Sequence, residues 1–183
     1  MKLQRLLSYV RQAVDDYRMI DSSDVIAVGV SGGKDSLALL YALKELQHFY
    51  PNPYTIKAIT VDLGLGNQNT DEIEQLCKSM EIEYHIVRTE IGTIIFKERH
   101  EKNPCSLCAK MRKGALNNEA LRIGCNKVAY AHHKDDFIET FLMSLLFEGR
   151  IHTFSPKTYL DKSKLMVIRP LMYINEGEII SFK

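Results

Sequence analysis

Ser31-Gly32-Gly33-Lys34-Asp35-Ser36 lies between an apolar run, residues 25–30, and a segment with helically spaced apolar residues, 37–43. A buried strand, a glycine-rich turn and a helix start are typical of an anion-binding site, because glycine lets backbone N–H groups converge on the anion. The helix N-terminus adds unpaired N–H donors and about half a positive charge. Ser31 and Ser36 add hydroxyl groups to the turn, and Lys34 adds an ammonium group. The stretch therefore predicts a phosphate-binding site.

Two common phosphate-binding motifs are absent from this chain. The P-loop needs two glycines five residues apart, followed by Lys and Ser/Thr, and the dinucleotide motif needs G-x-G-x-x-G. Gly32 and Gly33 are adjacent, so neither spacing is present. The remaining alternative is a solvated Ser/Gly turn in an ordinary strand–helix unit. The strand, turn and helix in sequence favour the phosphate site.

Composition predicts one globular domain. The chain has 183 residues, of which 45% are hydrophobic and 26% charged, and its net charge is +1. We therefore expect a single domain over residues 1–183, with an amphipathic N-terminal helix over 1–20. Charged residues interrupt that segment, which excludes the apolar region of a signal peptide, and no apolar run is long enough to span a bilayer. Four cysteines without a secretion signal favour a reducing compartment, the cytoplasm.

Alternating strand and helix patterns predict an α/β fold. Apolar runs indicate five strands, at 25–30, 55–61, 81–87, 127–131 and 164–168. Helical spacing indicates helices at 34–47, about 70–80, 105–124 and 135–147. This order predicts a doubly wound, mostly parallel five-stranded sheet with helices on both faces, Rossmann-like in architecture. Ligands of such sheets bind at the carboxyl ends of the strands.

Polar residues follow two of these predicted strands. Asp62 ends the second strand, where a carboxylate can accept from a ribose hydroxyl, hold Mg²⁺ or simply form a turn. His132 and His133 end the fourth strand, and Asp135 and Asp136 open the next helix. Helix capping explains the two acids but not the histidines. Because adjacent strand residues point to opposite sides, we expect one of the two histidines to face the ligand.

Cys105 and Cys108 lie at positions i and i+3, on one face of a predicted helix. A lone C-x-x-C serves zinc sites, iron–sulphur clusters and redox pairs alike. Cys77 and Cys125 lie in apolar patterns and are expected in the core. A basic run surrounds the pair, and it is either a solvated face or a binding patch. Its members are Lys97, Arg99, Lys102, Lys110, Arg112 and Lys113.

Four stretches in chain order resemble one enzyme family. They are SGGKDS (31–36), CSLC (105–108), AHHKDDFIET (131–140) and IRPL (168–171). Together they resemble the tRNA 2-thiocytidine synthetase branch of the PP-loop ATP pyrophosphatases, whose fold is of the adenine nucleotide alpha hydrolase type. The resemblance implies a sulfurtransferase that uses ATP and Mg²⁺. It would adenylylate O2 of a cytidine in the tRNA anticodon loop, release pyrophosphate and then substitute sulphur for the activated oxygen.

The resemblance also implies roles for individual residues. ATP phosphates and metal would be held by Ser31, Gly32, Gly33, Lys34, Asp35 and Ser36, with Asp35 as an Mg²⁺ ligand. Asp62, His132 and His133 would contribute to nucleotide binding. Cys105 and Cys108 would bind a 4Fe-4S cluster. The catalytic residues implied are Lys34, Asp35, Cys105, Cys108 and Asp135. Expected partners are tRNA, a sulphur donor (a persulfide-carrying protein or sulphide) and a second copy of the chain, with no membrane.

The family pattern has a third cluster cysteine downstream of the IRPL segment, and this sequence stops at Lys183, inside a predicted helix. A fragment that lacks a C-terminal extension is the favoured interpretation, and a shortened member without a three-cysteine cluster is the other. Two further alternatives stay open. One is a lysidine-type tRNA ligase or another PP-loop ATP pyrophosphatase; such a ligase shares the phosphate motif but needs no C-x-x-C. A non-catalytic nucleotide-binding module needs only the loop.

Overall fold

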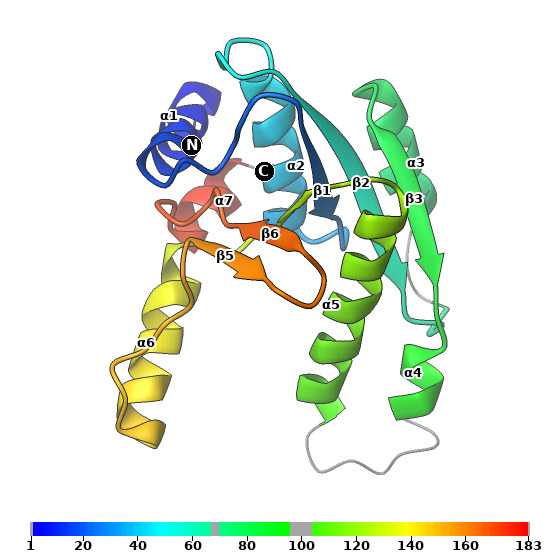
Figure 1. The fold of residues 1–183 in the computed structure, drawn as a ribbon, viewed down its shortest axis with the longest axis vertical. Coiled ribbons are helices and arrows are strands. Elements are labelled where there is room, and N and C mark those ends of the chain that lie inside the picture. The colour runs from blue at the N-terminus through cyan, green and yellow to red at the C-terminus, as the bar shows by residue number, and fades with distance from the viewer. Residues whose placement is uncertain (1, 67–69, 96–103, 183) are drawn as a thin grey trace.

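The computed structural model describes residues 2–66, 70–95 and 104–182 (Figure 1). The helices are α1 (Leu3–Asp16), α2 (Lys34–Leu46), α3 (Thr70–Ser79), α4 (Ile91–Thr93), α5 (Pro104–Arg122), α6 (Lys134–Glu148) and α7 (Glu176–Phe182). The strands are β1 (Asp24–Gly29), β2 (Tyr54–Asp62), β3 (Glu83–Arg88), β4 (Lys127–Ala129), β5 (Lys157–Leu160) and β6 (Leu165–Ile168). Within these ranges no helix is long and apolar enough to cross a membrane.

The strands form one sheet in the order β3-β2-β1-β4-β6-β5. All neighbouring strands are parallel except β5, which runs antiparallel to β6. The predicted α/β class and mostly parallel sheet are confirmed. Strand order reverses between β1 and β4, because β2 and β3 lie on one side of β1 and β4 lies on the other. Ligands of open α/β sheets bind at such a reversal, outside the carboxyl ends of the strands.

The predicted number of strands was wrong, because the sheet has a sixth strand, β5. Its four residues, Lys157–Leu160, are too few for a period-two pattern to stand out. Pairing with β6, with Lys157 opposite Ile168, supplies the stability that the local sequence lacks. The fourth strand also ends at Ala129 instead of residue 131. Because the strand is shorter, the side chains after Ala129 do not follow the alternation of a strand.

Helices cover both faces of the sheet (Figure 1). On one face, α1, α2, α3 and α7 pack with inward side chains of β1 and β2 in a single apolar cluster. On the other face, Leu116 and Ala120 of α5 and Ile91 of α4 pack against Ala27 and Ile59. The amphipathic N-terminal helix was predicted over 1–20 and runs over Leu3–Asp16. In Figure 1, α5 and α6 extend downward past the carboxyl ends of the strands, one on each side.

A buried ion cluster joins the starts of β1 and β4. The Lys127 ammonium lies 2.6 Å from a carboxylate oxygen of Asp24 and 2.7 Å from one of Asp21. Its Nζ also donates to the Met19 carbonyl at 2.9 Å. Lys127 and Asp24 are each only 4% exposed. Buried charges of this kind must be paired, because an isolated one loses its hydration without compensation.

We expect Lys127→Met to destabilise the fold by about 3 kcal/mol, because it leaves the Asp24 carboxylate buried without its cation. Urea unfolding followed by circular dichroism measures the change. The matched control is Arg11→Met, which removes an exposed ion pair with Asp15 and should cost no more than about 0.5 kcal/mol. Equal losses in the two variants would contradict a structural role for the buried cluster.

Candidate functional site

The loop after β1 is shaped by its glycines and serines. Gly32 has φ +78°, in the left-handed region that favours glycine. The Ser36 hydroxyl accepts from the Ser31 N–H at 3.1 Å and donates to the Gly33 carbonyl at 2.9 Å. Gly33 is the N-cap of α2 and brings no capping side chain, so the first N–H groups of the helix stay available to a ligand. The loop has the geometry of an anion site.

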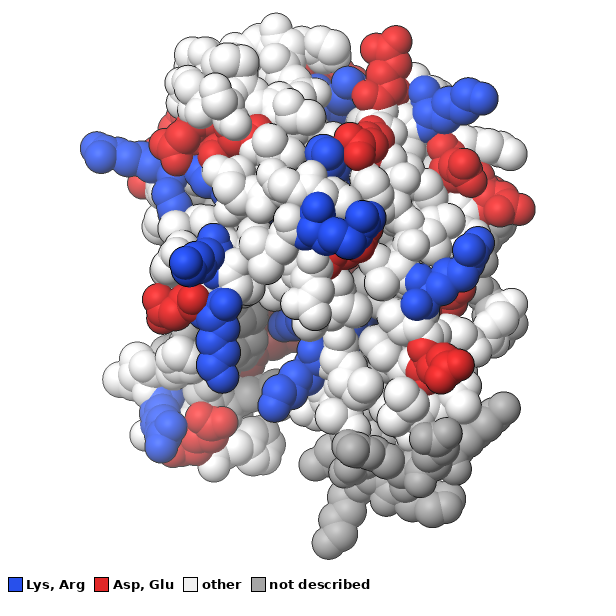
Figure 2. All heavy atoms as spheres, turned by 45° about the vertical axis from the view of Figure 1, so that its right-hand side comes forward, with Lys and Arg blue, Asp and Glu red and all other residues white. Residues whose placement is uncertain are grey.

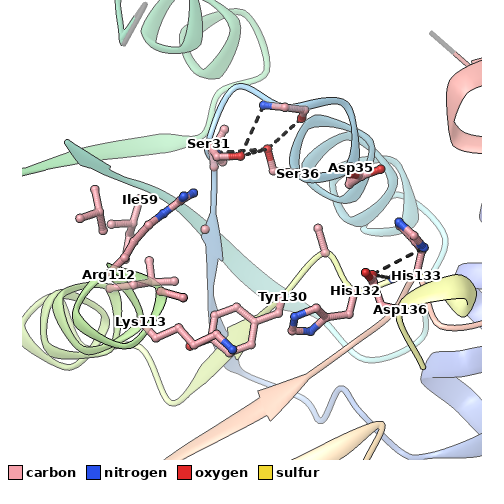
Figure 3. Close-up of a pocket in the computed structure, with 17 residues that line it drawn as sticks. Ser31, Asp35, Ser36, Ile59, Arg112, Lys113, Tyr130, His132, His133 and Asp136 are labelled. Atoms are coloured by element: carbon pink, nitrogen blue, oxygen red, sulfur yellow. Dashed lines mark hydrogen bonds and ion pairs between the residues drawn. The ribbon is translucent and has the colours of Figure 1, made fainter. Parts of the chain in front are cut away.

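A cavity of about 370 Å³ opens at the carboxyl ends of β1 and β4. The loop contributes Ser31, Gly33, Asp35 and Ser36 to its lining. Helix α5 contributes Arg112 and Lys113, and the segment after β4 contributes Tyr130, His132, His133 and Asp136. Figure 3 shows these side chains converging from three elements. The cavity therefore lies at the reversal of strand order, where a ligand is expected.

Both histidines line this cavity, so the expectation that only one would face the ligand was wrong. The reason is that β4 ends at Ala129, and strand alternation does not extend to His132 and His133. His133 instead serves as the N-cap of α6, and its backbone N–H donates to Asp136 at 2.8 Å. Its buried Nδ1 has no hydrogen-bond partner among the described residues.

His132 has an unusual electrostatic environment. The pKa of His132 is lowered to about 4, mainly by burial and further by the nearby positive charges of Arg169 and Lys113. The imidazole is therefore uncharged at neutral pH. Asp136 opposes this shift and His133 adds to it, both more weakly. The cavity thus holds a neutral imidazole beside two basic side chains of α5.

The basic side of the cavity comes from α5. The Lys113 ammonium lies 5.6 Å from the Tyr130 ring centroid. Burial of Lys113 lowers its pKa, and the positive charge of Arg169 lowers it further. Figure 2 shows a hollow in the lower half of the molecule with basic side chains at its edge. Of the predicted basic run, Arg112 and Lys113 line the cavity. Lys97, Arg99 and Lys102 lie outside the described residues.

Lys34 and Gly32 are absent from the lining of the cavity that the other loop residues line. Lys34 Nζ lies 3.2 Å from Asp35 and 2.8 Å from Glu176 of α7, and hydrogen bonds to these two carboxylates raise the pKa of Lys34. Together with Gly32 it borders a smaller apolar cavity, where Ile179 of α7 also lies. Asp35 lines the larger cavity, and its Oδ1 is buried without a hydrogen-bond partner. A buried, unpartnered carboxylate oxygen beside the loop suits a metal ligand.

Two predicted carboxylates lie outside the cavity lining. Asp62 Oδ1 accepts from the Gly64 N–H at 2.9 Å, which is the turn geometry that its sequence context allowed. Asp135 Oδ2 accepts from the Glu176 N–H at 2.6 Å, and so connects α6 to α7. The cavity carboxylate of this segment is the neighbouring Asp136. Sequence spacing alone did not separate Asp135 from Asp136, because both occupy the first turn of α6.

The two cysteines of C-x-x-C lie in the first turn of α5. Cys105 is exposed and Cys108 partly buried, whereas Cys77 and Cys125 are buried in the two core clusters. Cys108 precedes Arg112 by four residues, so the thiol and the cavity guanidinium share one side of α5. Among the described residues, no group of three His, Cys, Asp or Glu side chains is arranged to hold a metal.

The chain matches the PP-loop domain family over residues 3–183. It belongs to the PP-loop family. It is 40% identical over 179 residues to the tRNA-cytidine(32) 2-sulfurtransferase of Geotalea uraniireducens (strain Rf4), covering 97% of this chain and 71% of the relative. The same-named protein of Pelobacter propionicus is 41% identical over 180 residues, covering 98% of this chain and 67% of the relative.

Solved structures with this PP-loop fold include a tRNA thiolase. The U34-tRNA thiolase NcsA from Methanococcus maripaludis, solved with its [4Fe-4S] cluster, has a TM-score of 0.74 and 29% identity. The match covers 97% of this chain and 61% of that one. The NH3-dependent NAD synthetase from Campylobacter jejuni subsp. jejuni has a TM-score of 0.59 at 20% identity, covers 99% of this chain and 72% of that one, and shows the likeness of fold alone.

We expect Gly32→Ala to weaken binding of pyrophosphate to the loop. Its φ of +78° strains an alanine by about 1–2 kcal/mol, although the added Cβ would meet only Ile73 at 3.5 Å. Titration calorimetry with pyrophosphate measures the affinity, and urea unfolding measures the stability. The matched control is Gly177→Ala in α7, where a Cβ meets nothing within 4 Å and φ is not positive. Unchanged pyrophosphate affinity in Gly32→Ala would contradict the anion-site assignment.

Proposed function

We propose that this PP-loop domain carries out ATP-dependent tRNA thiolation, activating O2 of a cytidine in the anticodon loop and replacing it with sulphur. One observation carries the proposal: the loop after β1, the basic side of α5 and the segment after β4 line a single cavity, and α5 begins with two free cysteines. The named relatives support the reaction and the substrate, since they are tRNA-cytidine(32) 2-sulfurtransferases.

The first step proposed is adenylylation of the base. Cytidine O2 attacks the α-phosphorus of ATP, the bond to the β-phosphate oxygen breaks, and pyrophosphate leaves. The loop N–H groups and Lys34 would hold the departing phosphates, and Asp35 is the proposed Mg²⁺ ligand through its unpartnered oxygen. Lys34 must then exchange Glu176 for phosphate. Electrostatic stabilisation of this kind dominates phosphoryl and nucleotidyl transfer.

The second step proposed replaces the activated oxygen. With sulphide as the donor, HS⁻ attacks C2 of the adenylylated base, its proton is released, and AMP leaves with the former O2. Arg112 and Lys113 lie where they can stabilise the negative charge on AMP. Asp135 stays our predicted catalytic carboxylate, and the cavity position of Asp136 makes it the second one to test. Nucleotide-binding roles for His132 and His133 agree with their position in the cavity, whereas Asp62 forms a turn beside it.

Cys105 and Cys108 suit two ligands of an iron–sulphur cluster, because an exposed and a partly buried thiol lie three residues apart on one helix. The described residues supply no third ligand beside them, so we assign them this partial ligand set. When bound, a cluster would hold and deliver sulphur. The remaining partners proposed are single-stranded anticodon-loop nucleotides, which can splay a base into the cavity, a persulfide or sulphide donor, and a second copy of the chain.

The reaction is tested by incubating the protein with ATP, Mg²⁺ and tRNA and separating the nucleotide products. We expect AMP and pyrophosphate, formed only with tRNA. Lys34→Ala should lower their formation by about tenfold or more, because charge-assisted contacts to the phosphates are lost. Lys78→Ala, at the exposed end of α3, is the matched control. ADP and phosphate would overturn the proposal. Nucleotide binding without turnover would favour a non-catalytic module.

Cysteine variants distinguish thiolation from amino-acid ligation. We expect Cys105→Ser and Cys108→Ser to abolish sulphur incorporation into tRNA while ATP affinity stays within about threefold, since neither thiol lines the nucleotide cavity. Thiolated nucleosides are measured by mass spectrometry of digested tRNA. Ser106→Ala, between the two thiols, is the control. Retention of full tRNA-modifying activity by both cysteine variants would instead support a lysidine-type ligase.

A further inference from the structure

Arg169 is a buried cation next to the nucleotide cavity. It follows β6 directly and is only 8% exposed. Across the described ranges, 2–66, 70–95 and 104–182, no carboxylate forms an ion pair with it. Burial lowers the pKa of Arg169, and its guanidinium remains charged at neutral pH. A buried guanidinium without a counter-ion is costly, so its other contacts must offset part of the lost hydration.

Those contacts aim the guanidinium at His132. Its Nε donates to His132 Nδ1 at 3.2 Å. On the opposite side, Nη1 donates to the Ser155 carbonyl and, at 3.2 Å, to the Thr158 hydroxyl of β5. The guanidinium carbon lies 4.9 Å from the Phe154 ring centroid. The short antiparallel strand and the residues before it therefore fix the position of Arg169.

The imidazole of His132 is fixed as well. Its ring centroid lies 4.7 Å from the centroid of the Phe154 ring and 5.8 Å from that of the Tyr130 ring. The Tyr130 hydroxyl is itself held, because it donates to Asn117 Oδ1 at 2.9 Å. A ring nitrogen that accepts a hydrogen bond carries no proton, so a neutral His132 must carry its proton on Nε2. Figure 3 shows this ring beside Tyr130 at the cavity.

We propose that Arg169 is a positioning residue of the nucleotide site: by donating to Nδ1 of His132, it fixes the tautomer that presents an Nε2–H donor to an oxygen atom of the bound nucleotide. The identity of the ligand as ATP rests on the proposed function. The titratable and charged groups that act on His132 are Arg169, Lys113, Asp136 and His133, and of these only Asp136 favours a charged ring. The donor accordingly stays neutral throughout the physiological pH range.

Histidine NMR tests the tautomer directly. In protein with ¹⁵N-labelled histidines, the His132 signal is identified by its loss in His132→Gln. We expect a proton on Nε2, none on Nδ1, and no titration between pH 5 and 8. A proton on Nδ1, or protonation within that pH range, overturns the proposal. This measurement needs neither tRNA nor turnover. Its result is therefore independent of whether the thiolation assay succeeds.

Nucleotide affinity tests the role of Arg169. We expect Arg169→Met and His132→Leu each to weaken ATP binding by about tenfold, as for the loss of one hydrogen bond to a charged group. His132→Gln should stay within about threefold of the original chain, because its carboxamide N–H₂ can donate from a similar position. Arg122→Met, which removes an exposed guanidinium at the end of α5, is the matched control and should leave ATP affinity unchanged.

The double variant Arg169→Met/His132→Gln separates positioning from a structural role. A carboxamide has no tautomer to fix, so ATP affinity should recover to within about threefold of His132→Gln alone. Affinity that stays low in the double variant, while circular dichroism shows a folded protein, overturns the proposal. If Arg169→Met does not fold, the wild-type tautomer and the comparison of His132→Gln with His132→Leu decide the question.

Discussion

The pairing of β1 with β4 is the interaction on which the rest of the structure depends. It brings the loop after Gly29 and the segment after Ala129 to the same edge of the sheet. The buried Lys127 ammonium joins the beginnings of the two strands through Asp24 and Asp21. Register errors between the strands would separate the serine hydroxyls from the histidines. An ion cluster at one end of the sheet therefore supports the ligand cavity at the other.

Local sequence was sufficient to predict the parts of the site that lie within single segments. The hexapeptide 31–36 predicted its own turn. Its adjacent glycines permit a left-handed backbone, which Gly32 adopts, and the helix begins directly after them. Apolar runs likewise predicted β1 and β2, which are buried on both faces. The α/β class follows from the same runs and the helices between them.

Tertiary contacts decided what the sequence left open. Strand β5 exists because it pairs with β6, and Arg169 lies beside His132 only because that hairpin fixes it. Both histidines line the cavity because β4 ends at Ala129, which no local pattern indicated. Lys34 borders the smaller cavity although its neighbour Asp35 lines the larger one, and the Lys34 ammonium is held there by Glu176 of α7. Such placements arise from contacts between distant segments and leave no spacing signal.

The contact between Lys34 and Glu176 makes α7 a competitor of the ligand. Their side-chain atoms lie 2.8 Å apart, so an anion that takes the ammonium group must displace the carboxylate. By linkage, an anion bound at Lys34 weakens the docking of α7 as much as that docking weakens the anion. Ile179 of this helix is buried against α2, so the exchange reaches the core. Occupancy of the loop is thereby coupled to the packing of the last helix described in the chain.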